Sequence, residues 1–207
     1  AYNNLQHLHG NTAYGIIDND WMDESSIQVY KEQNIFVLPF NEVEMMLVDE
    51  AVVKSCLPFD DDTGQQRKFN NFKDAIISSC REKKDKIISI ALKKRLDEFM
   101  GSHFIEESEP NEHDAYVFLD SLASAFDVDS TFNKINSIVE ESLASSDFSR
   151  ILKICNLKKE IIDYRGNTEI TPKFKEKALS RITLDSDLQK ELRHKYFKEL
   201  EAELLDH

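Results

Sequence analysis

Two short apolar runs near the start of the chain limit most strongly what it can fold into. Residues 13–17 (AYGII) and 35–38 (IFVL) contain several β-branched side chains, and a segment with helical spacing of apolar residues, 24–33, lies between them. Strands that are apolar throughout are typical of parallel sheets, in which both faces are covered. The first 40 residues therefore predict a strand–helix–strand unit, which needs further strands or covering helices to be stable.

The rest of the chain has the pattern of helices. Turn residues are scarce, with 5 Gly and 4 Pro in 207 residues, which argues against sandwiches, barrels and repeated β folds. The expected fold class is α/β: a small, incomplete parallel-sheet part at 1–57, followed by a larger all-helical part at 58–207. We expect helices over residues 43–57, 67–100, 113–126, 130–144, 147–163, 172–182 and 185–205.

The connections between these helices carry signals of their own. Gly101 is a candidate stop for the helix over 67–100. Thr171, as N-cap, with Pro172 in the first helical position, is expected to begin the helix over 172–182. Polar or acidic segments predict turns at 58–64 and 164–167 and a linker at 106–112.

Composition and motifs exclude several classes of function. The three cysteines, Cys56, Cys80 and Cys155, are far apart, which excludes a disulfide framework or a CxxC zinc site and favours a cytoplasmic location. Neither GxxxxGK[ST] nor GxGxxG occurs, so the chain has no glycine-rich phosphate loop. No apolar run approaches 18 residues, so we expect no membrane partner.

Charge is unevenly distributed along this acidic chain. The net charge is −13, which argues against a protein that covers nucleic acid through a general positive charge. Bases nevertheless dominate residues 66–105, and acids dominate 106–149. Three interpretations of the basic helix stay open: it contacts nucleic-acid phosphates, it is the solvated face of an amphipathic helix, or it docks against the acidic segment.

Acidic side chains follow both predicted strands. Asp18 and Asp20 come directly after the first strand, and Glu42 and Glu44 follow the second. Because parallel strands end at the same edge of a sheet, three or four carboxylates would meet at one rim. Carboxylate oxygens are preferred ligands of Mg²⁺, so this rim predicts a divalent-cation site. The alternative is that both Glu side chains only favour the start of the helix that follows.

These residues resemble a known family. Gly15–Ile16–Ile17–Asp18–Asn19–Asp20, followed by a short helix, an apolar strand and Glu42–Val43–Glu44–Met45, is similar to the Toprim-like domain of OLD-type, ATPase-associated anti-phage nucleases. The match departs at Met45, where the family usually has Asn. The resemblance covers about residues 10–55. Residues 56–207 resemble the family only in being helical.

The resemblance implies a fold, an activity and partners. It implies Mg²⁺ or Mn²⁺ held by Asp18, Asp20 and Glu42, with Glu44 and a lysine from the helical part, Lys159, as catalytic residues. The expected reaction is metal-assisted cleavage of a phosphodiester bond in DNA or RNA. The expected partners are a fused or separate AAA/ABC-type ATPase and further copies of the chain.

One element of the family is missing from the matched region. Toprim domains have an earlier strand that ends in a catalytic Glu, and residues 1–13 contain no acid. We therefore expect a C-terminal fragment of a longer ATPase–Toprim protein, or a separate effector trimmed at its N-terminus. In either case, an incomplete site would leave this chain inactive by itself. The alternative function is a non-catalytic helical interaction or dimerisation module with a degenerate Toprim remnant. A third, weaker hypothesis is another DxD-type magnesium enzyme, such as a phosphatase.

Overall fold

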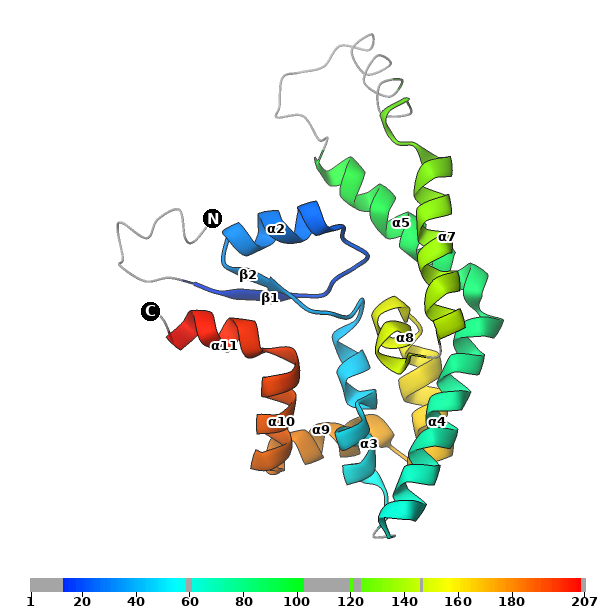
Figure 1. Ribbon diagram of the computed structural model, residues 1–207, viewed down its shortest axis with the longest axis vertical. Coiled ribbons are helices and arrows are strands. Elements are labelled where there is room, and N and C mark those ends of the chain that lie inside the picture. The colour runs from blue at the N-terminus through cyan, green and yellow to red at the C-terminus, as the bar shows by residue number, and fades with distance from the viewer. Residues whose placement is uncertain (1–12, 59–60, 103–119, 121–123, 146, 206–207) are drawn as a thin grey trace.

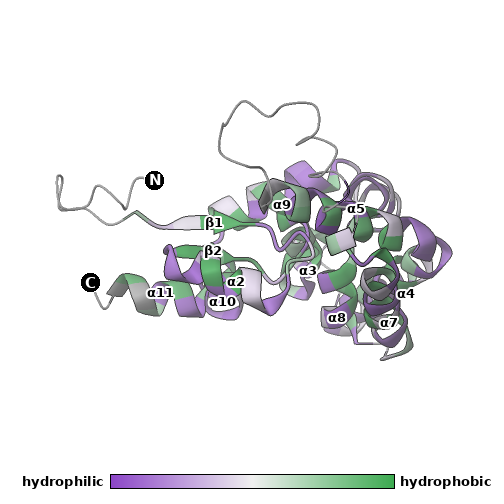
Figure 2. Ribbon diagram, turned by 90° about the horizontal axis from the view of Figure 1, so that it is seen from above, coloured by the Kyte–Doolittle hydropathy of each residue, from purple (hydrophilic) through white to green (hydrophobic). Residues whose placement is uncertain are grey.

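The structure is a computed structural model that describes residues 13–58, 61–102, 120, 124–145 and 147–205 (Figure 1). It is mostly helical, with a small parallel sheet near the start of the chain. Viewed from above, the strands, the helix between them and the last two helices lie to one side of the long helices from the middle of the chain (Figure 2). The coarse prediction of a small α/β part followed by a larger helical part is therefore confirmed.

The predicted strand–helix–strand unit is present. Strands β1 (Gly15–Ile17) and β2 (Ile35–Val37) pair in parallel, and helix α2 (Glu24–Glu32) connects them. Asp23 caps the start of α2, because its carboxylate accepts a hydrogen bond from the backbone N–H of Ser26 at 2.9 Å. Apolar β-branched residues thus form the strands, and a polar cap starts the crossover helix.

The strands are less buried than their sequence suggests. The side chain of Ile16 is 52% exposed, and the residues of β2 are half-buried. Helix α2 packs against β2, and the ring of Phe36 lies 6.1 Å from that of Phe197 near the C-terminus. Within the described residues, the expectation that both faces of the sheet are covered is met only in part.

The first helices are divided more finely than predicted. They are the 3₁₀ helix η2 (Val43–Val48), α3 (Glu50–Cys56), α4 (Asp62–Glu82) and α5 (Lys84–Ser102). Asp49 separates η2 from α3, since its carboxylate accepts from the N–H of Ala51 at 2.9 Å and caps α3. Lys83 ends α4, so one continuous helix over 67–100 is wrong. Gly101 does not end α5, which continues to Ser102.

The second half also departs from the predicted boundaries. Its elements are α7 (Val128–Ser145), α8 (Phe148–Ile154), the π-helix η3 (Lys159–Ile170), α9 (Phe174–Leu184), α10 (Ser186–Tyr196) and α11 (Lys198–Leu205). The turn predicted at 164–167 lies inside η3, and Phe197 separates α10 from α11. The linker at 106–112 and most of the helix predicted over 113–126 lie outside the described residues.

The cap predicted at Thr171 and Pro172 is wrong. Thr171 ends η3, and α9 begins after Lys173, whose φ of 58° is left-handed. The carboxamide oxygen of Asn167 accepts from the N–H of Phe174 at 2.8 Å, so a side chain from η3 bonds the first turn of α9. This contact satisfies an N–H of the first turn of α9, which the side chain of Thr171 was expected to do.

One cluster of buried side chains joins the two predicted parts. It includes Met45 and Val52 from residues 1–57 and Phe72, Ile151 and Phe174 from residues 58–207. The boundary expected at residue 57 falls just after α3, but the core continues across it. Within the described residues, the basic helix contacts the acidic segment directly: Lys84 Nζ lies 2.5 Å from Glu140 Oε1 on α7, and Arg81 Nη2 donates to the carbonyl of Leu143 at 3.2 Å. In the part of the chain that the structure describes, no helix combines the length and apolarity needed to cross a membrane.

Candidate functional site

The carboxyl ends of the two strands are held together beyond the sheet itself. The N–H of Leu38 donates to the carbonyl of Ile17 at 2.9 Å, and the N–H of Asn19 donates to the carbonyl of Phe40 at 2.8 Å. These bonds bring the two loops that carry the acidic residues to the same edge of the sheet.

Asp18 contacts the second strand-end loop directly. Its Oδ1 accepts a hydrogen bond from the backbone N–H of Val43 at 3.0 Å. Burial raises the pKa of Asp18 despite this hydrogen bond, and the charges of Asp20 and Glu44 raise it further. Asp18 is thus a carboxylate whose negative charge is incompletely compensated.

Glu42 lies against the helical part of the chain. Its Oε2 accepts from the backbone N–H of Lys158 at 3.0 Å. Burial is the main cause of the raised pKa of Glu42. The hydrogen bond and the charge of Lys158 act to lower this pKa, and the charges of Glu44 and Asp18 act to raise it. Asp18, Glu42 and Glu44 therefore form one electrostatic group.

Glu44 differs because it has two cationic neighbours. Its Oε1 lies 3.4 Å from Nζ of Lys158 and 3.4 Å from Nζ of Lys175 on α9. Burial acts to raise the pKa of Glu44, but its own backbone N–H and these two ammonium groups together lower it. The charge of Glu44 in turn raises the pKa of Lys158. Glu44 and Lys158 thus keep each other ionised.

Asp20 faces a different partner from the one predicted. Its Oδ1 lies 2.9 Å from Nζ of Lys94 on α5. Its charge still raises the pKa of Asp18, but its carboxylate pairs with the basic helix. The left-handed φ values of 46° at Asp20 and 65° at Trp21 turn the chain at this point. Asp18 and Asp20 therefore have different partners: Asp18 contacts the loop after β2, and Asp20 contacts α5.

Of the two adjacent lysines at the start of η3, the structure places Lys158, and not Lys159, in contact with the carboxylates. Helix α8 ends at Ile154, and the chain then runs from Cys155 to Leu157 without helical structure before Lys158 enters the helical turn that leads into η3. This break presents the N–H and the ammonium of Lys158 to Glu42 and Glu44. The sequence shows two adjacent lysines, Lys158 and Lys159, as candidates for this role. Which of them contacts the carboxylates depends on where α8 ends, and the sequence did not predict that end.

The donor set fits a hard cation, although its members do not converge in the arrangement shown. Within the described residues, no group of three or more His, Cys, Asp or Glu side chains is placed to hold a metal ion. Asp18, Glu42 and Glu44 are nevertheless all carboxylates, the ligand type that Mg²⁺ prefers. Binding would require Glu42 to exchange its contact with the N–H of Lys158 for a contact with the ion.

Comparisons with known proteins do not identify the chain. No protein-family model matches it, and neither a curated protein nor a solved structure is significantly similar.

Proposed function

We propose that this chain is part of a Toprim-like, Mg²⁺-dependent nuclease that cleaves phosphodiester bonds in DNA or RNA, in the cytoplasm, together with an AAA/ABC-type ATPase in phage defence. The observation that supports the proposal best is the group formed by Asp18, Glu42, Glu44 and Lys158 at the carboxyl ends of two parallel strands. Phosphodiester cleavage needs a cation near the reacting phosphate. The carboxylates can hold that cation, and the neighbouring lysine can bind the phosphate.

Each residue of this group has a distinct role in the proposal. Asp18 and Glu42, whose pKa values are raised, are the principal cation ligands, with Asp20 as a third if it leaves Lys94. Bound Mg²⁺ supplies stabilisation of the charge that develops on the phosphate. Glu44 holds the ammonium of Lys158, which is then close enough to contact a phosphate oxygen of the substrate.

Calorimetric titration with Mg²⁺ and with Mn²⁺ tests the site. We expect saturable binding that is lost in Asp18→Asn/Glu42→Gln. Asp74→Asn, a change of an exposed acid on α4, is the matched control and should bind like the unchanged chain. Absence of saturable binding, or equal binding by the double variant, would refute the carboxylate site.

Cleavage is assayed separately on single- and double-stranded DNA and RNA. We expect metal-dependent cleavage that Lys158→Ala abolishes and that Lys159→Ala retains. Metal binding without cleavage of any of these substrates would contradict nuclease activity of this chain alone. In that case, the same substrates with the ATPase partner decide whether the chain is a nuclease at all.

A second candidate function is a non-catalytic helical module that pairs with a second copy of this chain. An apolar groove of about 530 Å³ beside α10 and α11 favours it, lined by Leu192, Phe197, Leu200 and Leu204. Light scattering over a range of concentrations should then show a dimer that Leu204→Glu dissociates. Val128→Glu, at another exposed apolar residue, is the control. A monomer at all concentrations would exclude this function.

A further inference from the structure

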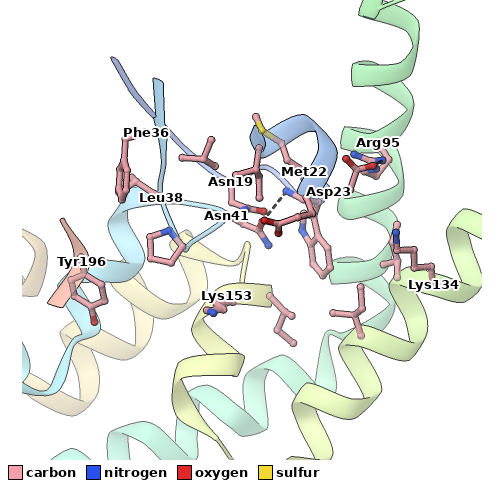
Figure 3. Close-up of a pocket in the computed structure, with 18 of the residues that line it drawn as sticks. Asn19, Met22, Asp23, Phe36, Leu38, Asn41, Arg95, Lys134, Lys153 and Tyr196 are labelled. Carbon is pink, nitrogen blue, oxygen red and sulfur yellow. Dashed lines mark hydrogen bonds and ion pairs between the residues drawn. The ribbon is translucent and has the colours of Figure 1, made fainter. Parts of the chain in front are cut away.

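A large cleft lies beside the strand-end loops. Its volume is about 950 Å³, and its walls come from the loop after β1, strand β2, α7, α8 and the α10–α11 junction. Asn19 and Asn41 line it from the strand ends, and Lys153 lines it from α8 (Figure 3). This volume is within the range of sites that bind small organic ligands.

Three lysines give this cleft an unbalanced positive charge. Lys134, Lys153 and Lys198 line it, and all three are exposed. Among the described residues, none of them has a carboxylate within ion-pairing distance. In a chain of net charge −13, three lysines without acidic partners around one cleft indicate a site for an anion.

The other charged groups of the cleft are mostly engaged already. Arg95 Nη2 lies 2.5 Å from Asp23 Oδ2, and Lys195 Nζ lies 2.5 Å from Asp49 Oδ2. Glu199 lies 3.9 Å from Lys31. Glu24, in the first turn of α2, is the remaining acid of the lining. The acids therefore do not cancel the three lysines.

The same cleft also offers a surface for a planar ring. Trp21 and Phe36 line it, with apolar neighbours such as Ile138 of α7. The indole N–H of Trp21 is buried and has no hydrogen-bond acceptor in the described part of the chain. A buried donor of this kind is costly to leave unpaired, so a ligand that supplies an acceptor would be favoured.

The backbone of Trp21 is held in place by a buried side chain. The carboxamide oxygen of Asn41, which is 3% exposed, accepts from the backbone N–H of Trp21 at 2.9 Å. This bond joins the two strand-end loops, and both of its residues line the cleft. The aromatic side of the cleft is thus preorganised, which lowers the cost of binding.

We propose that this cleft binds a nucleoside phosphate. Lys153 contacts the phosphate oxygens, Lys134 and Lys198 add to the positive charge of the cleft, and Trp21 contacts the base, which accepts a hydrogen bond from the indole N–H. Bases are planar and carry ring nitrogens and carbonyl oxygens as acceptors, so they match both the ring of Trp21 and its unpaired N–H. This inference goes beyond the proposed function, because the cleft is lined by residues other than Asp18, Glu42 and Glu44.

Fluorescence of Trp21 provides a direct test, because it is the only tryptophan in the chain. The chain is titrated with AMP and with ATP in the presence of EDTA, so that the carboxylate site cannot contribute. We expect a saturable change in emission. Adenosine, which lacks the charge, and tripolyphosphate, which lacks the ring, should each bind at least about tenfold more weakly.

Variants locate the ligand. Lys153→Ala should weaken AMP and ATP binding about tenfold or more, as expected for the loss of a charge-assisted contact. Lys190→Ala is the matched control, since Lys190 is exposed on α10 and pairs with Asp187 at 3.1 Å. Trp21→Phe, followed by calorimetry, retains a ring but removes the N–H, and it should weaken binding of both nucleotides.

Four outcomes would overturn the proposal. They are no saturable response to either nucleotide by fluorescence and calorimetry, equal affinity for tripolyphosphate, equal effects of Lys153→Ala and Lys190→Ala, and binding of a short single-stranded oligonucleotide without binding of free nucleotides. The last result would identify the cleft as a path for a nucleic-acid strand.

Discussion

The backbone N–H of Lys158 donates to the carboxylate of Glu42 over 3.0 Å, although 116 positions separate the two residues in the sequence. The contact places a lysine from the start of η3 against the end of the parallel sheet. Because it uses the backbone of Lys158, replacing the side chain leaves it intact. The role of the ammonium group can therefore be separated from the position of the chain.

Replacing Lys158 should change the ionisation of Glu44. In Lys158→Ala, we expect the pKa of Glu44 to rise, because one of the two ammonium groups that lower it is lost. Lys159→Ala should leave that pKa unchanged. Carboxyl ¹³C chemical shifts followed through a pH titration measure both. Equal effects of the two variants would contradict the assignment of Lys158.

Asp23 should make the fold sensitive to acid. The Ser25 hydroxyl, the Ser26 N–H and Arg95 hold its pKa well below the ordinary value of 3.8, despite partial burial. A lowered pKa stabilises the fold above that ordinary value, and the stabilisation is lost as the pH falls toward the lower folded-state pKa. Asp23→Ala should therefore lower the free energy of unfolding by about 1 kcal/mol near neutral pH.

The acid dependence is measured by urea unfolding at several pH values. The difference between Asp23→Ala and the unchanged chain should shrink steadily below the ordinary pKa of 3.8. Asp127→Ala is a suitable comparison, since Asp127 also accepts from a backbone N–H, that of Ser130, at the start of α7. A constant difference across the acid range would show that Asp23 acts only as a neutral cap.

The glycines provide a second matched pair. A Cβ at Gly166, which lies in η3, would be 2.3 Å from Cδ1 of the buried Phe174, so Gly166→Ala should destabilise the fold by about 1–3 kcal/mol. At Gly101, nothing lies within 4 Å of the added atom. Gly101→Ala should instead stabilise α5 by up to about 1 kcal/mol. Thermal unfolding measures both, and a loss of stability at Gly101 would contradict the helical assignment there.

Tyr196 should stabilise the fold through one buried carboxylate. Its hydroxyl donates to Oδ2 of Asp49 at 2.5 Å, and Asp49 is 2% exposed. Burial and this hydrogen bond both raise the pKa of Tyr196. Tyr196→Phe leaves the carboxylate short of a donor and should cost about 1–3 kcal/mol in chemical unfolding. Tyr164→Phe, at a ring that is 56% exposed, should have almost no effect.

The sequence was most informative where local pattern and burial agree. The two apolar runs and the acids that follow them predict β1, β2 and the rim carrying Asp18 and Glu42, because strand polarity alone brings those ends together. The helix breaks were not predictable in the same way. Lys83 and Phe197 are not helix breakers, and they end helices because tertiary packing outweighs propensity.

Partners of the candidate site were harder to predict than the site itself. Asp20 pairs with Lys94, and Glu44 with Lys175, across segments whose relative positions depend on the whole fold. The cleft around Trp21 has the same origin, since its lysines come from α7, α8 and α11. No spacing along the chain encodes such a set.

The long-range hydrogen bonds and ion pairs that anchor the N-terminal part bear on how such a chain can change during evolution. Glu42, Glu44 and Asp49 are held by residues 116, 131 and 146 positions away. A recombination event that exchanged only the first 57 residues would separate Glu44 and Asp49 from the side chains that pair with them. The strand–helix–strand unit and the C-terminal helices are therefore expected to be inherited together, with substitutions on one side compensated by substitutions on the other.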